Sequence, residues 1–321
     1  MPVFDEIIET TYLGGVVLFY NLNLFGKRLR EIRNTLKLKQ IYITEVTGIG
    51  DKTIRRIESG KVLPKLDTLE ILSSVYKEDL VSLLIEYRLD DYSVFLEIKN
   101  KIELKLDNEI QHTLNIELKE LNILLASVKN SYYKNLIHQL ILFTEAIILY
   151  KNKSYNNNEV LDKFVKALKI TTPLFDLDDF NLFVYSSMEI RVLMNIAFVF
   201  NRLKDKEKYL EIMEFCVKSV DTDEEIYPKL CHNLAGAYTR NKEFEKALDY
   251  SIMGIKSCQE NRNFNGLSLL YYGKGNSEYR LNKEEYMESF KTSIYLCKAF
   301  GQPSLEKAII DKCKKFFDID L

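Results

Sequence analysis

Apolar residues recur at helical spacing between residues 25 and 64. The spacing predicts three short helices with a common core, and the turn Thr47-Gly48-Ile49 separates the second from the third. The apolar positions of this predicted core are Leu29, Ile32, Leu36, Ile43, Val46, Ile54 and Ile57. Pro64 ends the third helix, and two further helices are predicted from Asp67 to Tyr76 and from Asp79 to Arg88.

The rest of the chain keeps this helical periodicity, and glycine and proline together account for only 17 of the 321 residues. We therefore predict an all-α protein. The acidic pair Asp90-Asp91 marks a hinge after the fifth helix. The predicted organisation is an N-terminal extension (1–23), a helix-turn-helix domain (24–90), connector helices (91–130) and a helical repeat domain (131–321).

A motif repeats in the C-terminal part of the chain. Asn195-Ile196-Ala197-x-x-Phe200 recurs 38 residues later as Asn233-Leu234-Ala235-x-x-Tyr238, and each copy is followed by a turn and a second helix. A third unit spans Tyr272 to Leu296, and a weaker one lies around Phe143 to Leu168. This spacing is typical of tetratricopeptide repeats, whose helix pairs stack into a superhelix lined on its inner face by the first helix of each pair.

Charge is distributed unevenly along the chain. Residues 24–66 hold eleven Lys and Arg against four acidic residues, a net charge of +7. The other residues must carry −9, because the whole chain carries −2. A strongly basic segment in an otherwise acidic protein indicates binding to phosphates, so we predict that residues 24–90 bind double-stranded DNA.

The third short helix is the predicted recognition helix, because side chains near the amino end of such a helix read bases in the major groove. Arg56 is the first candidate for base reading, Arg55 is expected to face the DNA backbone, and Gln40 to bind a phosphate. The predicted DNA-binding residues are Gln40, Gly50, Asp51, Lys52, Arg55 and Arg56. Arg33 and Glu58 are predicted to pair and join the first helix to the third. A solvated basic face is the alternative interpretation for each flanking cation, Lys27, Arg28, Lys37 and Lys39.

Fixed motifs in this region resemble the Xre or Cro/C1-type helix-turn-helix over about 60 residues. The matching positions are Leu29-Arg30-x-x-Arg33, Gln40, Thr47-Gly48-Ile49, Ile54-x-x-Ile57-Glu58-x-Gly60 and Pro64. The chain departs from the family pattern at Lys39 and Gly50, where Ser or Thr is usual, and at Thr44, where Ala is usual. Each lost helix cap costs roughly 1 kcal/mol.

Joined to the helical repeats, the whole chain resembles the RNPP superfamily of Gram-positive bacteria (Rgg, Rap, NprR, PlcR and PrgX types). The resemblance implies a cytoplasmic homodimer that binds a short imported signalling peptide in its superhelical groove and alters transcription. Peptide identity, operator sequence and the choice between activator and repressor stay open.

The aligned repeats supply candidates for the inner face of the groove. Equivalent positions are Arg191 with Lys229, Asn195 with Asn233, and Arg202 with Arg240 and Arg280. An Asn side chain can donate to and accept from an extended peptide backbone, and a cation can bind a peptide carboxylate. The predicted peptide-binding residues are Arg191, Asn195, Phe198, Arg202, Lys229, Asn233, Arg240, Tyr271, Tyr272 and Arg280. The three arginines that precede a turn have an alternative role, because cations stabilise helix carboxyl ends.

Other residue patterns limit the possible chemistry. Five cysteines without a C-x-x-C motif and three scattered histidines predict reduced core cysteines, no metal and no cofactor. No nucleophile and base lie at a recognisable spacing, so we expect no enzyme. The apolar run Leu13 to Tyr20 is far shorter than the roughly 20 residues of a membrane span and lacks the features of a signal peptide. We expect the extension to pack loosely or to exchange a strand with a neighbouring copy; a dimer-stabilising arm is the alternative.

Two other functions stay open at this point. The repeats could bind a protein partner of phage or mobile-element type rather than a peptide, which would require a broad interface and no response to short peptides. The chain could also be a scaffold that sequesters another regulator, and a lack of salt-dependent DNA affinity would favour that function.

Overall fold

The computed structural model describes residues 12–13, 16–17, 20–88, 91–107, 113–128, 130–151, 156–264 and 266–320. In this part of the chain the protein is helical apart from a short antiparallel strand pair, β1 (Tyr12–Leu13) with β2 (Val16–Val17), and one bridge between Tyr20 and Arg88. The predicted all-α class is confirmed. The predicted hinge residue Asp90 and most of the N-terminal extension lie outside the described residues.

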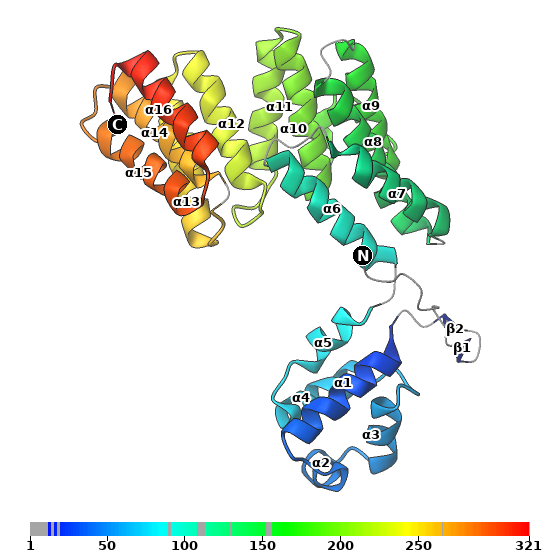
Figure 1. Ribbon diagram of the computed structural model, residues 1–321. Coiled ribbons are helices and arrows are strands. Elements are labelled where there is room, and N and C mark those ends of the chain that lie inside the picture. Colours follow the sequence, from blue (N-terminus) through cyan, green and yellow to red (C-terminus); the bar gives the residue numbers. More distant parts are fainter. Residues whose placement is uncertain are drawn as a thin grey trace. The chain divides into compact units, whose positions relative to one another are not determined.

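The chain forms two compact units, one built on residues 1–108 and 119–133 and the other on residues 109–118 and 134–321. Five short helices in the first unit form a small bundle, which we call the head (Figure 1). They are α1 (Leu22–Thr35), α2 (Gln40–Thr47), α3 (Asp51–Glu58), α4 (Leu66–Tyr76) and α5 (Leu80–Glu86). Helix α1 begins two residues before the predicted boundary at residue 24, because Asn21 caps it by accepting a hydrogen bond from the amide of Leu24 (3.1 Å).

One apolar cluster holds the head together. Its buried members are Leu22, Phe25, Leu29, Ile32, Ile43, Ile54, Ile57, Leu69, Leu72, Tyr76, Leu80 and Leu84. Five of the seven predicted core residues are among them, and Leu36 packs against the cluster while partly buried. The prediction for Val46 was wrong, since its side chain is exposed. Helix α2 has eight residues and buries only Ile43, so its opposite side faces solvent.

Close approach of α1 and α3 depends on a glycine. A methyl group at Gly26 would lie 2.5 Å from the backbone oxygen of Ile57 and 2.7 Å from that of Glu58. Because the contacting atoms belong to backbone, no side-chain rotation could relieve such a clash. Gly26 therefore allows α3 to lie this close to α1.

Helices α6 (Asp91–Asp107) and α7 (Asn115–Ser127) occupy the region predicted as connectors. The helices that follow form antiparallel pairs, which we call the body (Figure 1). They are α8 (Ser131–Lys151), α9 (Asn157–Thr171), α10 (Ser187–Arg202), α11 (Lys206–Lys218), α12 (Tyr227–Arg240), α13 (Phe244–Glu260), α14 (Leu267–Arg280), α15 (Tyr286–Ala299) and α16 (Pro303–Phe317), with a 3-10 helix at Phe180–Leu182. Each helix packs mainly on its neighbours in the chain, as in a repeat protein.

The predicted repeats have a common turn geometry. Lys204, Lys242 and Asn282 follow the first helix of successive pairs with φ of 68°, 65° and 56°. In each turn the next amide bonds to a carbonyl of the preceding helix, at 3.0 Å, 2.9 Å and 2.9 Å. The third turn spans residues 281–285, whereas the second spans residues 241–243. Because its turn is longer, the second helix of the third unit begins two residues later than the alignment with the second unit would place it.

All five cysteines are free and buried, as predicted. Burial raises the pKa of the Cys258 thiol to about 11 and that of Cys313 to about 11. Of the helices in the described part of the chain, none has both the length and the apolar character required to cross a membrane.

Candidate functional site

Helix α3, which the sequence predicts as the recognition helix, has a buried and an exposed face. Ile54, Ile57 and Glu58 point into the head. Lys52, Arg55 and Arg56 are exposed, and Gly50 precedes the helix with extended backbone. Residues 52 and 56 lie one turn apart at the centre of the outward face, and within the described part of the chain neither forms an ion pair. This face presents cations to solvent and leaves them available for a ligand.

A buried carboxylate holds the back of α3 in place. Glu58 is only 3% exposed. Its oxygens accept hydrogen bonds from Arg33 at 2.6 Å and 3.1 Å, which confirms the predicted pair. They also accept from Gln40 Nε2 at 2.7 Å and from the Tyr76 hydroxyl at 3.2 Å. The hydrogen bond that Arg33 donates to Glu58 raises the pKa of Arg33, and burial raises the pKa of Tyr76. One carboxylate thus ties α1, α2 and α4 to the recognition helix.

This network also engages a residue predicted to contact DNA. The side-chain amide of Gln40 points inward to Glu58, so it is occupied within the head. Asp51, the only acidic residue in the first turn of α3, pairs with Arg55 (Nη2 to Oδ2, 2.6 Å). Of the six predicted DNA-binding residues, Gln40 and Asp51 therefore have side-chain partners inside the head.

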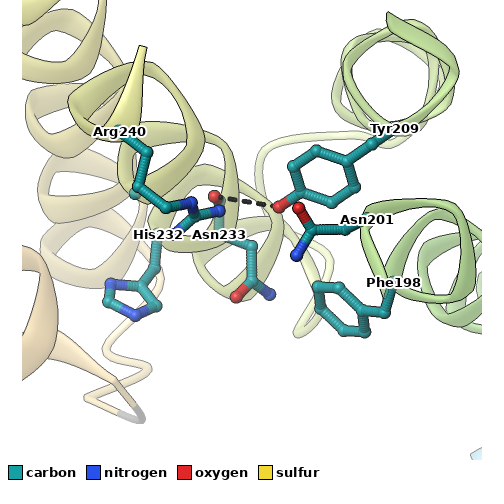
Figure 2. Close-up of a pocket in the computed structure, with 7 residues that line it drawn as sticks. Phe198, Asn201, Tyr209, His232, Asn233 and Arg240 are labelled. Atoms are coloured by element: carbon teal, nitrogen blue, oxygen red, sulfur yellow. Dashed lines mark hydrogen bonds between the residues drawn. The ribbon is translucent and has the colours of Figure 1, made fainter. Parts of the chain in front are cut away.

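The body contains a pocket of about 340 Å³ at the junction of three helices (Figure 2). Helix α10 contributes Phe198 and Asn201, α11 contributes Tyr209, and α12 contributes His232, Asn233, Gly236 and Arg240. Figure 2 shows the α12 side chains on one side and those of α10 and α11 on the other. Among the described residues that line it, one is a cation and none is a carboxylate.

Polar groups in the pocket are positioned by contacts between helices. The Tyr209 hydroxyl donates to the backbone oxygen of Asn233 at 3.4 Å, and its ring lies 6.3 Å from that of Phe198. Burial raises the pKa of Tyr209, and Arg240 partly offsets the rise. Burial also lowers the pKa of His232 to about 4, with the positive charges of Lys312 and Arg240 contributing. At neutral pH the pocket therefore combines a positive guanidinium with a neutral imidazole.

Three of the predicted groove residues, Phe198, Asn233 and Arg240, line this pocket. Asn195 is buried and donates to the backbone oxygen of Arg191 one turn earlier (2.8 Å). Arg202 lies 3.6 Å from the centre of the Tyr150 ring and donates to the backbone oxygen of Tyr150 at 2.7 Å. These two residues therefore have partners inside the body.

The remaining predicted residues lie away from the pocket. Arg280 lies 5.5 Å from the ring centre of Phe317, and Tyr272 lies 5.8 Å from that of Phe290. Tyr271 accepts from Gln259 at 3.5 Å, and Lys229 is partly buried on α12. The structure thus brings three of the ten predicted residues together in one cavity.

Sequence reasoning missed four lining residues: Asn201, Tyr209, His232 and Gly236. Asn201 and Gly236 each lie three positions after a predicted residue, Phe198 and Asn233, and so belong to the same helical face. That spacing could have identified both. His232 lies three positions after Lys229, another predicted residue, so the same spacing could have identified it as well.

A small helix-turn-helix head joined to a body of helical repeats defines the class of this protein. Residues 29–83 match the family model for the helix-turn-helix, HTH_3, so the predicted motif is confirmed. No curated protein matches the sequence.

Solved structures extend the similarity to the whole chain. PlcR of Bacillus thuringiensis in complex with the peptide PapR7 and DNA has a TM-score of 0.63 at 17% identity, covering 90% of this chain and 100% of that chain. The SHP pheromone receptor Rgg2 of Streptococcus dysgalactiae has a TM-score of 0.54 at 13% identity, with 91% and 99% covered. ComR of S. thermophilus in complex with DNA and its signalling peptide ComS has a TM-score of 0.52 at 14% identity, with 89% and 97% covered. The chain therefore has the fold that the resemblance to the RNPP superfamily implied.

Proposed function

We propose that the protein is a DNA-binding transcriptional regulator controlled by a short signalling peptide. In this proposal residues 24–90 bind double-stranded DNA, residues 91–130 connect, and residues 131–321 bind the peptide and form a cytoplasmic homodimer. One combination carries the proposal: exposed cations on α3 and a carboxylate-free pocket between repeats occur in one chain. The fold is shared with PlcR and ComR, both described in complex with DNA and a peptide.

DNA binding is assigned to the outward face of α3. Lys52 and Arg56 are exposed one turn apart, so both can enter a major groove together. Gly50 has open space where a side chain would be, which allows the backbone to approach a phosphate. Because the Gln40 side chain bonds to Glu58, we assign the phosphate contact of residue 40 to its backbone amide at the start of α2.

Selection from randomised DNA duplexes tests this assignment. The wild-type protein is expected to enrich a sequence motif, and Arg56→Ala is expected to lower discrimination at one base pair roughly 5- to 150-fold. Lys256→Ala is the matched control, because it removes an exposed cation from α13. An unchanged motif in Arg56→Ala, with both variants folded, would contradict base reading by α3.

Peptide binding is assigned to the α10–α12 pocket. Among the described residues the Asn233 side-chain amide reaches only the Met194 sulfur, at 3.7 Å, so it has hydrogen-bonding capacity left for a peptide. Arg240 supplies the charge that a peptide carboxylate requires. A bound peptide regulates transcription only if it binds one arrangement of the two DNA-binding heads more tightly than the other.

The two repeat-equivalent asparagines provide a matched test of the pocket. A peptide enriched by the wild-type protein from a randomised library would be titrated into Asn233→Ala and Asn195→Ala by calorimetry. We expect Asn233→Ala to weaken binding by about 1 kcal/mol or more, the usual contribution of a hydrogen bond. Asn195→Ala should bind normally, because that side chain bonds within its own helix. Equal affinities in both variants would place the peptide elsewhere.

A further inference from the structure

Arg55 and Asp51 form a bidentate ion pair on the exposed side of α3. Nε of Arg55 lies 3.1 Å from Oδ1 of Asp51, and Nη2 lies 2.6 Å from Oδ2. Two nitrogens of one guanidinium edge therefore meet both carboxylate oxygens. The Arg55 side chain is nevertheless 67% exposed, so the opposite edge faces solvent.

The geometry of the arginine side chain determines which donors of Arg55 stay available to a base. A guanidinium is planar and carries five N–H donors in fixed directions. With the Nε–Nη2 edge bound to Asp51, the donors of Nη1 and the second donor of Nη2 have no partner in the part of the chain that the structure describes. Two parallel donors on one edge match O6 and N7 of guanine in the major groove. Asp51 thus holds the plane of Arg55 while leaving its guanine-binding edge accessible.

A carboxylate at this position suits a base contact better than a phosphate contact. Asp51 would repel a phosphate that approached Arg55, whereas a guanine edge carries no net charge. Lys52, another exposed cation of α3, has no ion pair within the described residues and can neutralise a phosphate without this opposition.

We propose that Arg55 reads a guanine and that Asp51 is the positioning residue that aims it. This inference rests on the proposed DNA-binding function. It changes the role of Arg55 from the expected backbone contact to base recognition, beside Arg56.

The test is selection of randomised 20-base-pair duplexes by the full-length protein and three variants. Arg55→Lys keeps the charge and removes the planar fork, and Asp51→Asn keeps the shape and removes the carboxylate charge. Glu31→Gln is the control, because it removes one acid from the head and breaks the exposed Arg28–Glu31 pair (3.7 Å) without altering α3. Affinity for the enriched duplex and for an unrelated duplex is measured at two salt concentrations in parallel.

The wild-type motif is expected to contain a guanine whose enrichment falls roughly 5- to 150-fold in Arg55→Lys. Asp51→Asn should lose preference at that same base pair while its low-salt affinity for unrelated duplexes rises, since one negative charge is gone. Glu31→Gln should raise that affinity and leave the motif unchanged. If Asp51→Asn loses base preference while its affinity for unrelated duplexes rises, Asp51 positions Arg55 and does not merely stabilise the fold.

Two results would overturn the inference while leaving DNA binding intact. An unchanged motif in Arg55→Lys would remove Arg55 from base reading. A motif in Asp51→Asn identical to that of Glu31→Gln would reduce Asp51 to a surface charge. If the wild-type protein enriches no motif at all, the proposed function fails and the inference fails with it.

Discussion

The head and the body both bury a carboxylate, but they satisfy it in different ways. Glu58 in the head, 3% exposed, receives Arg33 from α1, Gln40 from α2 and Tyr76 from α4. Glu189 in the body, 6% exposed, receives only hydroxyl groups and its own capping-box amide. Its donors are Thr171 (2.6 Å), Thr172 (2.7 Å) and Ser186 (2.8 Å from the amide and 2.9 Å from the hydroxyl).

The difference reflects how each region is assembled. A five-helix bundle has to fix the mutual placement of helices that are distant in sequence, and a buried ion pair 25 residues apart does this. A repeat protein needs contacts only between neighbours, so Glu189 can be satisfied by the end of α9 and the start of its own helix. Disturbing Glu58 should therefore affect the whole head, whereas disturbing Glu189 should act locally.

Glu58→Ala tests the first half of this comparison and has the largest expected effect. Removing the acceptor leaves the Arg33 charge buried without its partner, which costs roughly 3–5 kcal/mol. The measurement is urea unfolding of the full chain, with hydrogen exchange of the α1 to α3 amides as the local readout. Glu31→Gln, at an exposed pair, should cost less than about 0.5 kcal/mol. Equal stability losses in the two variants would show that Glu58 does not hold the head together.

Replacement of His232 tests whether this side chain makes the stability of the body depend on pH. Its pKa falls from 6.5 to about 4 on folding, because burial and the charges of Lys312 and Arg240 disfavour the imidazolium. Between these two pH values the unfolded chain binds more protons than the folded one, so stability falls as the pH drops through this window. The loss is at most about 3 kcal/mol.

The readout is the free energy of unfolding measured between pH 7 and pH 4 for the wild-type protein and His232→Gln. The variant should depend less on pH across this window, and hydrogen exchange should place the difference in α12. His138→Gln serves as the control for histidine replacement elsewhere in the body. Parallel pH profiles for wild type and His232→Gln would contradict the assignment.

Glu189→Ala has the smallest expected effect. Burial alone would raise the pKa of Glu189, but the hydrogen bonds from Thr171, Thr172 and Ser186 lower it. Its stabilising contribution is therefore present above the ordinary carboxyl pKa of 4.5 and is lost as the pH falls through the lower folded value. At neutral pH we expect a cost of roughly 1–3 kcal/mol.

Where in the body Glu189→Ala loosens the structure tests the comparison more directly than the size of the stability loss. Hydrogen exchange should accelerate in α9 and α10 and stay unchanged in α14 to α16, because the repeats contact only their neighbours. Glu207→Gln, an exposed acid at the start of α11, is the control. Uniform acceleration along the body would mean that the repeats unfold together, as the head is expected to do.

Local sequence pattern predicted much of the head. Helical spacing identified Ile54 and Ile57 as core residues, and the positions of Arg33 and Glu58 predicted their pairing; both predictions are confirmed. Val46 failed, because an eight-residue helix can keep helical spacing while only one of its apolar residues reaches the core. The inward turn of Gln40 depends on the position of Glu58 and could not be derived from α2 alone.

In the body, positions that are equivalent in the aligned repeats do not make equivalent contacts. Asn195 and Asn233 are equivalent in sequence, yet one bonds to its own helix and the other lines a pocket. Arg202 and Arg240 are equivalent as well, but Arg202 lies over the ring of Tyr150, whereas Arg240 lines the pocket beside Tyr209. Each outcome depends on the helix packed alongside, which differs from repeat to repeat.

The sequence by itself determined the helical class, the helix-turn-helix, the repeat period and the basic character of the recognition segment. These follow from periodicity, fixed motifs and charge, which act over a few residues and survive in any arrangement of the helices. Tertiary structure alone decided which polar side chains remain available for a ligand. A hydrogen-bonding group is free only if no neighbour satisfies it, and the neighbours come from helices that lie close in space and far apart in the chain.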